Sequence, residues 1–282
     1  MRADLHTHSS RSDGVLTPAE LVCEAQRVGL DCLALTDHDS VAGVEEAVTA
    51  GRAAAVEIIV GVELSVRDGQ GIEDHLLGFF VDPRAPSLQV YLGTLQDDRQ
   101  AMAEQTIQLL AHLGVPVSAE RVAELATGAV ITRPHIARAL VEAGHVTSEQ
   151  EAFERYLGSG KPASPKRPSP DPRTAIQAIR AAGGTTALAH PVFSHDAEAT
   201  ERLANLAPRL DAMVDAGLQA IECTYPDATP ELTQQLSALA RERKLITTGG
   251  SDFHGPGKAP YVALGSVTVD DATVQALRQL AT

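Results

Sequence analysis

The sequence predicts an α/β fold, a TIM-like barrel with a helical insertion. Two observations lead to this prediction. Short apolar runs alternate with helical patterns over residues 2–81 and again over 171–282, which is typical of βαβ units and a parallel sheet. The segment between them shows only helical patterns. We therefore predict a barrel domain made of residues 1–81 and 171–282, and a cap domain made of the insertion, residues 82–170.

The part of the chain before the insertion is expected to supply four strands and two helices. The strands are expected over residues 2–5, 32–35, 58–62 and 76–81. Thr17, Pro18 and Glu20 match a capping box with proline at the first helical position, and the helix that they begin should end at Gly29. A second, alanine-rich helix is expected over residues 41–55.

The insertion and the second part of the barrel follow in order. Helices in the insertion are expected over 101–113, 119–126, 135–143 and 148–157, and a proline-rich connector over 161–170 closes it. Later strands are expected over 185–189, 220–223 and 245–248, giving about seven, the count expected of a TIM-like barrel. Later helices are expected over 175–182, 231–243 and 274–280. A longer helical stretch should reach Ala216 and be broken at Pro208.

The composition is that of an ordinary soluble globular protein, with 282 residues of which 44% are hydrophobic and 21% charged. A net charge of −14 argues against stable binding to long nucleic acids, which would need a basic surface. No apolar run approaches the ~20 residues that cross a bilayer, and the first residues lack a signal peptide's apolar stretch. The three cysteines, Cys23, Cys32 and Cys223, show no metal-binding spacing and are expected to be buried. We expect a cytoplasmic protein that contacts no membrane.

Nine potential metal ligands lie at the ends of predicted strands. The histidines are His6, His8, His38, His75, His190 and His254, and the carboxylates are Asp13, Glu63 and Asp252. The carboxyl ends of parallel strands meet on one face of a barrel, so these side chains are expected to converge. A single histidine at a strand end, or an isolated H-x-H, occurs often by chance. The full set is hard to explain without metal, because buried like charges and unpaired nitrogens would each cost several kcal/mol.

The ligand types also indicate a substrate class. Imidazole and carboxylate groups suit zinc, manganese and iron. The three carboxylates contribute roughly −3, so two divalent ions would leave a pocket charge of about +1 and three ions about +3. Such a pocket suits a phosphate monoester dianion and acidifies bound water, which provides a hydroxide nucleophile near neutral pH. The sequence contains no G-x-S-x-G elbow and no P-loop, which argues against a serine hydrolase or a nucleoside-triphosphate enzyme.

Six motifs follow one another along the chain. They are Asp4-Leu5-His6-Thr7-His8, Ser12-Asp13-Gly14, Leu35-Thr36-Asp37-His38, Gly61-Val62-Glu63, Ala189-His190-Pro191 and Gly250-Ser251-Asp252-Phe253-His254. In this order they resemble the motif series of the polymerase-and-histidinol-phosphatase (PHP) family, over nearly the whole chain. The resemblance implies a distorted (β/α)7 TIM-like barrel with three divalent metal ions, manganese in the first place and iron or zinc as alternatives.

The resemblance further implies which residues hold each ion. One ion would be held by His6, His8, Glu63 and Asp252. A second would share Glu63 and add His75 and His190, and a third would use Asp13, His38 and His254. Family members often have histidine at the position of Asp13. An aspartate there resembles the subgroup of nucleoside 3′,5′-bisphosphate phosphatases, some of which also trim RNA from the 5′ end.

The insertion resembles the helical cap of the same subgroup. The similar segments are Thr132-Arg133-Pro134-His135-Ile136-Ala137-Arg138, Phe153-Glu154-Arg155-Tyr156-Leu157 and Gly160-Lys161-Pro162. The resemblance implies that the substrate's second phosphate is bound by Arg133, His135, Lys161 and Arg99. Guanidinium groups suit this role because they bind phosphate oxygens bidentately. For Arg99, a solvated position on a helix face is an equal alternative.

The expected reaction is hydrolysis of the 3′-phosphate of a nucleoside 3′,5′-bisphosphate by a metal-bound hydroxide, with short 5′-phosphorylated RNA as a further substrate. Catalytic roles are expected for Asp13, Asp37, His38 and His254. Asp37 would orient His38 or, alternatively, shuttle a proton to the leaving group. Glu222 is expected to support the ligands rather than to bind metal.

Three alternatives stay open. A histidinol-phosphate-type phosphatase would act on a different monoester. An amidohydrolase that cleaves C–N bonds also begins with H-x-H, but it commonly has a bridging lysine where this chain has Glu63. A metal-binding regulatory module would keep the ligands without turnover.

Overall fold

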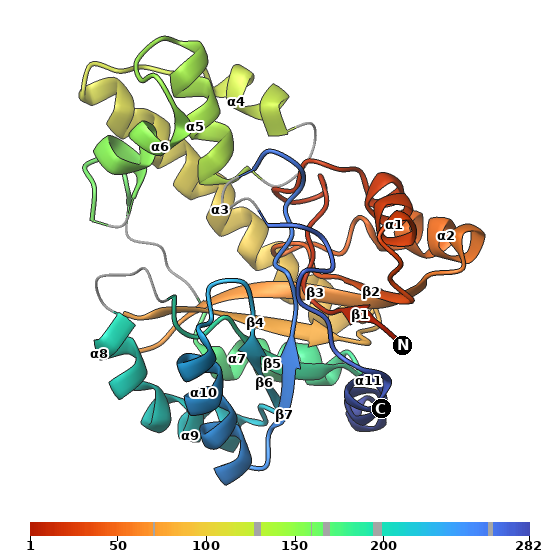
Figure 1. The fold of residues 1–282 in the computed structure, drawn as a ribbon. Coiled ribbons are helices and arrows are strands. Elements are labelled where there is room, and N and C mark those ends of the chain that lie inside the picture. Colours follow the sequence, from red (N-terminus) through yellow and green to blue (C-terminus); the bar gives the residue numbers. More distant parts are fainter. Residues whose placement is uncertain (70, 127–130, 159, 166–169, 194–198, 259–261) are drawn as a thin grey trace. The chain divides into compact units, whose positions relative to one another are not determined.

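The seven strands form one sheet in sequence order (Figure 1). They are β1 (Ala3–Asp4), β2 (Cys32–Leu35), β3 (Glu57–Arg67), β4 (Glu73–Phe79), β5 (Thr185–Ala189), β6 (Ala220–Thr224) and β7 (Ile246–Gly249). The computed structural model describes residues 1–69, 71–126, 131–158, 160–165, 170–193, 199–258 and 262–282, without the side chains of Gln96 and Arg99. Beyond the ends of β1 and β7, Thr7 pairs with Phe253, and the backbone nitrogen of His8 donates to the carbonyl of Phe253 at 2.9 Å. The result is a nearly closed barrel, which confirms the predicted fold class.

The prediction of a wholly parallel sheet is wrong at β4. This strand pairs antiparallel with both β3 and β5, whereas the other described pairs are parallel. The cause is the connection from β3, because only residues 68–72 join the two strands, too few for the helical crossover that a parallel neighbour needs. Within this connection the backbone nitrogen of Ile72 donates to the side chain of Asp68 at 2.9 Å. β3 and β4 therefore form a long hairpin.

Helices pack beside the strands of the barrel. They are α1 (Pro18–Arg27), α2 (Val44–Ala54), α7 (Pro172–Ala181), α8 (Ala199–Ala204), α9 (Leu206–Ala216), α10 (Pro230–Glu242) and α11 (Asp271–Leu280). The capping box of α1 is present. The backbone nitrogen of Glu20 donates to the Thr17 hydroxyl at 3.3 Å, and the Glu20 carboxylate accepts from the Thr17 backbone nitrogen at 2.8 Å. Gly29, with φ of 73°, follows the end of this helix as predicted.

The predicted helix break at Pro208 is wrong. The helical stretch is interrupted at Asn205, between α8 and α9, and Pro208 lies in the first turn of α9. Proline is tolerated there because the first backbone N–H groups of a helix have no partner within the helix.

The prediction for the cysteines also needs one correction. Cys32 and Cys223 are buried, but Cys23 is exposed because it lies on the face of α1 opposite the buried Leu21 and Val22. Among the described helices, none combines the length and the hydropathy that a bilayer crossing requires.

The chain divides into two compact units, which we call the barrel unit (Met1–Tyr91 with Ser169–Thr282) and the helical unit (Leu92–Pro168). The helical unit contains most of α3 (Pro86–His112), followed by α4 (Ala119–Ala126), α5 (Arg133–Glu142), α6 (Glu149–Ala152) and a π-helical turn, η1 (Phe153–Leu157). It has a core of its own, in which Leu110, Val122 and Leu140 are fully buried. This core shows that the helices of the unit hold one another in place.

Candidate metal centre

All nine predicted ligands belong to the described part of the barrel unit, and the structure brings them together. His6 and His8 follow β1, His38 follows β2, His190 follows β5, and Asp252 and His254 follow β7, while Asp13 lies in the loop after His8. We call this end of the barrel the mouth. Glu63 lies within β3 and not at its end, because β3 continues into the hairpin.

His75 lies near the start of its strand, and the reversal of β4 explains why it still reaches the mouth. Because β4 runs antiparallel to β3, its first residues lie beside the last residues of β3. His75 pairs with Ser65, two residues beyond Glu63. An all-parallel sheet would have placed His75 at the opposite end of the barrel.

Glu63 is the centre of the cluster. Its Oε1 atom lies 2.9 Å from Nδ1 of His75 and 3.0 Å from Nε2 of His190. Its Oε2 atom lies 3.2 Å from Nε2 of both His6 and His8, and 3.0 Å from Nδ1 of His38. One fully buried carboxylate thus lies beside imidazoles of more than one predicted metal site, as expected of a ligand shared between two ions.

The other two ligand carboxylates, those of Asp252 and Asp13, also lie close to imidazoles. Oδ1 of Asp252 lies 3.3 Å from Nε2 of His6 and 3.1 Å from Nε2 of His8. Oδ1 of Asp13 lies 3.3 Å from Nε2 of His254, whose Nδ1 donates to the carbonyl of Asp252 at 2.8 Å. The potential ligand atoms lie within 4.8 Å of one another in each of three groups, namely His6-His8-Glu63-Asp252, His8-Asp13-His38-His254 and His38-Glu63-His75.

The donor set fits divalent cations. Several of its atoms are buried without a hydrogen bond, namely Nε2 of His6, both ring nitrogens of His8, Nδ1 of His38, Oε2 of Glu63 and Oδ1 of Asp252. Buried polar atoms of this kind cost about 1–3 kcal/mol each unless a partner compensates them. Nitrogen and oxygen ligands suit manganese, iron and zinc, so cations held by these atoms would supply the missing partners.

The charges of the protein's own groups are strongly coupled. Burial alone would raise the pKa of Glu63 and of Asp252, but the surrounding imidazoles hold each pKa well below its usual range. Burial alone would lower the pKa of His8, but Asp252 and Glu63 outweigh it and raise this pKa to about 10. For His38 burial dominates and lowers the pKa to about 3. The carboxylates are therefore ionised at neutral pH, and His8 carries a proton that a cation would replace.

Two buried carboxylates, Glu222 and Asp4, form hydrogen bonds with the predicted ligands or with the residues next to them. Glu222 on β6 accepts from Nδ1 of His6 at 3.3 Å and from the backbone nitrogen of His190 at 2.9 Å. Asp4 accepts from the backbone nitrogens of Ser251 and Gly265, each at 2.9 Å. Glu222 thus has the supporting position that the sequence suggested, and it fixes which nitrogen of His6 faces the centre.

The Asp37 side chain accepts hydrogen bonds from a loop. Its Oδ1 accepts from the backbone nitrogen of Ser9 and from the hydroxyl of Ser12, and its Oδ2 accepts from the hydroxyl of Ser9, each at 2.7 Å. No hydrogen bond to His38 is present among the described residues. Asp37 therefore holds the loop that carries Asp13, and its expected roles toward His38 and the leaving group stay predictions.

The sequence analysis missed Lys258. Its ammonium group donates to the carbonyl of Asp13 and lies 3.3 Å from Oδ2 of the same residue. Its position four residues after His254, in a loop that follows the last motif, was the available signal. Lys258 adds a positive charge beside the His8-Asp13-His38-His254 group.

The residues predicted to bind the second phosphate belong to the helical unit, and their role stays a prediction. Arg133 is exposed at the start of α5. Nδ1 of His135 accepts from the backbone nitrogen of Thr132 at 3.1 Å, so a phosphate contact would have to come from Nε2. Lys161 is exposed in a turn. Arg99 lies in α3, and its side chain is outside the described part of the chain.

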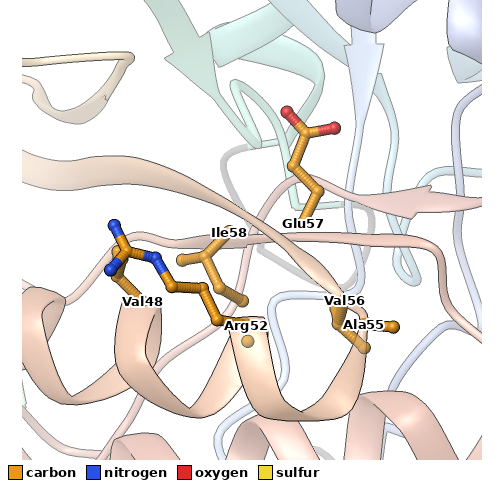
Figure 2. Close-up of a pocket in the computed structure, with 7 residues that line it drawn as sticks. Val48, Arg52, Ala55, Val56, Glu57 and Ile58 are labelled. Carbon is orange, nitrogen blue, oxygen red and sulfur yellow. The ribbon is translucent and has the colours of Figure 1, made fainter.

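A separate pocket lies where α2 is followed by β3 (Figure 2). It is lined by Val48, Gly51, Arg52, Ala55, Val56, Glu57 and Ile58. Glu57 precedes Glu63 by six residues, about 20 Å along an extended strand. The lining is mostly apolar and lacks the convergent polar groups of the metal centre, so we do not take it for the active site.

Comparison with known proteins finds similarity along most of the chain. The PHP domain matches residues 4–157. A 5′-3′ exoribonuclease of Haemophilus influenzae is 39% identical over 254 residues, which cover 90% of each chain. The 3′,5′-nucleoside bisphosphate phosphatase of Chromobacterium violaceum is 33% identical over 264 residues, 90% of this chain and 88% of that protein. A solved structure from Bifidobacterium adolescentis, of a protein proposed to be a metal-dependent phosphoesterase, is 30% identical with a TM-score of 0.88, covering 99% of this chain and 96% of that one.

Proposed function

The chain belongs to the PHP domain family of metal-dependent phosphoesterases, and we propose that it removes the 3′-phosphate of nucleoside 3′,5′-bisphosphates. Short 5′-phosphorylated RNA is a proposed further substrate. The observation that carries the choice is Asp13, an aspartate that lies 3.3 Å from His254 at a position where family members often have histidine. The names of two relatives, an exoribonuclease and a bisphosphate phosphatase, support the same substrate class. We place this activity in the cytoplasm.

Three divalent ions would be held by the nine ligands, manganese in the first place and iron or zinc as alternatives. Glu63 would bridge two of them, because its two oxygens face different imidazoles. When bound, such ions neutralise charge on phosphoryl oxygens and acidify a water molecule for attack on phosphorus. Against the three ligand carboxylates, three divalent cations would leave a pocket charge of about +3, which suits a dianionic phosphate.

The protein's own residues would prepare this site. Glu222 and Asp4 orient His6 and its neighbours, and Asp37 holds the loop that carries Asp13. His38 and His254 lie beside Asp13 at the mouth, where we propose that they would help to hold a cation near the reacting phosphate. Arg133, His135, Lys161 and Arg99 would bind the second phosphate and so select a bisphosphate over a monophosphate.

A side-by-side assay tests the proposal. Metal-reconstituted protein is given adenosine 3′,5′-bisphosphate, histidinol phosphate or a short 5′-phosphorylated RNA, and phosphate or nucleotide release is measured. We expect the bisphosphate to be hydrolysed with the highest kcat/KM. Activity on histidinol phosphate alone would overturn the substrate choice. Cleavage of C–N bonds without phosphate release would favour an amidohydrolase, and tightly bound metal without any hydrolysis would favour a regulatory module.

A further inference from the structure

We propose that Arg202 is a positioning residue that holds His75 and His190 against Glu63 and thereby sets the affinity for cations at this side of the metal centre. The inference rests on the proposed function in one respect, namely that the centre binds divalent cations. Arg202 itself is neither a predicted ligand nor part of any motif, and it lies on α8.

One atom of Arg202 reaches the neighbours of both imidazoles. Its Nη2 donates to the carbonyl of Glu73 at 3.0 Å, to Oδ1 of Asp74 at 3.2 Å and to the carbonyl of Pro191 at 3.4 Å. Glu73 and Asp74 directly precede His75, and Pro191 directly follows His190. The guanidinium group thus links the start of β4, which carries His75, to the turn after β5, which carries His190. These are the two imidazoles that lie beside Oε1 of Glu63.

The turn at His190 needs such support. His190 has φ of 21°, a left-handed backbone conformation that L-amino acids other than glycine rarely adopt. In this conformation its Nε2 lies 3.0 Å from Oε1 of Glu63. Glu222 holds the turn through the backbone nitrogen of His190, and the hydroxyl of Tyr225 donates to the carbonyl of Val192. Arg202 binds the carbonyl of Pro191, which lies between these two contacts in the chain.

At the start of β4, Asp74 has a second cationic partner besides Arg202. The Asp74 side chain is 1% exposed, and its Oδ2 binds Arg209 on α9, which also lies 3.3 Å from Oδ2 of Asp68. Removing Arg202 therefore leaves the buried carboxylate of Asp74 with a cationic partner. The fold should persist, whereas the Pro191 carbonyl loses its side-chain donor. This separation makes the positioning role measurable apart from stability.

The experiment measures cation binding and not turnover. Metal-free wild-type protein, Arg202→Ala and Arg202→Lys are titrated with Mn2+, and the bound metal per chain is determined by elemental analysis after dialysis. Arg243→Ala is the matched control, because Arg243 is 12% exposed compared with 18% for Arg202 and bonds a carboxylate and backbone carbonyls on α9 and α10, away from the centre. Thermal unfolding of each metal-free variant reports stability.

For Arg202→Ala we expect one ion to bind roughly 10- to 100-fold more weakly while the others are retained, as is usual when a partner behind a ligand is lost. Arg202→Lys should recover part of this affinity, and Arg243→Ala should bind metal as the wild type does. Unchanged binding in Arg202→Ala would overturn the inference, as would an equal loss in Arg243→Ala. If Arg202→Ala does not fold, Arg202→Lys decides, since wild-type affinity in it would also overturn the inference. A wild-type protein that binds no Mn2+, iron or Zn2+ would instead refute the proposed function.

Discussion

Glu63 and His75 meet at 2.9 Å from neighbouring antiparallel strands, and the same carboxylate faces four other imidazoles. We expect Glu63→Gln to lose at least one ion per chain and to lower phosphate release by more than about 100-fold, because the amide keeps the shape but removes the bridging charge. Elemental analysis and a phosphate assay check this. Glu57→Gln, on the same strand and in a surface ion pair with Arg278, is the control and should behave as the wild type.

Removing metal should destabilise the fold. Cations that bind the folded chain alone raise its free energy of unfolding by about 2.7 kcal/mol at a concentration one hundred times Kd. We therefore expect the melting temperature to fall by several degrees in chelator and to rise with added Mn2+ in a concentration-dependent way. A melting temperature that is the same in chelator and in excess Mn2+ would contradict the assignment of the centre.

Glu222→Gln should weaken cation binding without unfolding the protein. The carboxylate accepts from Nδ1 of His6 and from the backbone of His190, so an amide can replace one contact but loses the charge that makes His6 a stronger ligand. We expect roughly 10- to 100-fold lower affinity for one or more ions. Titration with Mn2+ measures it, and Glu231→Gln, at the start of α10, serves as the surface control.

Cation binding should release protons and tighten as the pH rises. In the metal-free protein Glu63 and Asp252 outweigh burial and raise the pKa of His8 to about 10, so His8 is protonated at neutral pH. A cation needs the neutral imidazole, hence binding expels this proton and is favoured by higher pH up to about that pKa. Calorimetric titration at about pH 7 and pH 8, in buffers of different ionisation enthalpy, counts the protons. Binding that releases none would show that His8 is not a ligand.

Arg133→Ala should affect the bisphosphate selectively. If Arg133 binds the second phosphate, its loss should raise KM for adenosine 3′,5′-bisphosphate roughly 10- to 100-fold, the equivalent of a charged hydrogen bond of about 1.5–3 kcal/mol. The KM for a nucleoside 3′-monophosphate should change little. Arg138→Ala, on the same helix and in a surface ion pair with Glu149, is the control. An equal rise for both substrates would refute the role of Arg133 as a phosphate selector.

The sequence allowed the barrel and its ligand set to be predicted because these signals are local. Most ligands follow an apolar run, and the carboxyl ends of parallel strands converge on one face whatever their exact register. His75 is the exception, because it reaches that face only through the reversal of β4. The capping residues Thr17 and Glu20 likewise act within one helical turn, so α1 could be placed accurately.

The reversal of β4 and the length of α3 were not predicted, for different reasons. The spacing between β3 and β4 is too short for a crossover, but the signal was hidden because β3 extends five residues past the predicted end at Val62. α3 begins at Pro86 rather than at residue 101. The signal was present but overlooked, because Leu88, Leu92 and Leu95 have the helical spacing i, i+4, i+7 and are buried.

Apart from Glu222, the supporting residues were not predicted, because their contacts join remote segments. Asp37 was expected to act on its neighbour His38, but its oxygens accept from Ser9 and Ser12, which lie 28 and 25 positions earlier in the chain. Lys258 reaches Asp13 across 245 positions, and Arg202 reaches Asp74 across 128. Polar contacts of this kind follow from the tertiary fold and leave no periodic trace in the sequence.

The long hairpin also determines where residues could be inserted without disturbing the barrel. Because β3 runs four residues past Glu63, the strand ends about 13 Å beyond this carboxylate, at the mouth of the barrel. A helical crossover would have carried the chain to the far end of the barrel. Residues inserted between β3 and β4 would therefore lie beside the mouth and would leave the register of every strand unchanged. Such insertions should change the size of the substrates that can reach the metal centre.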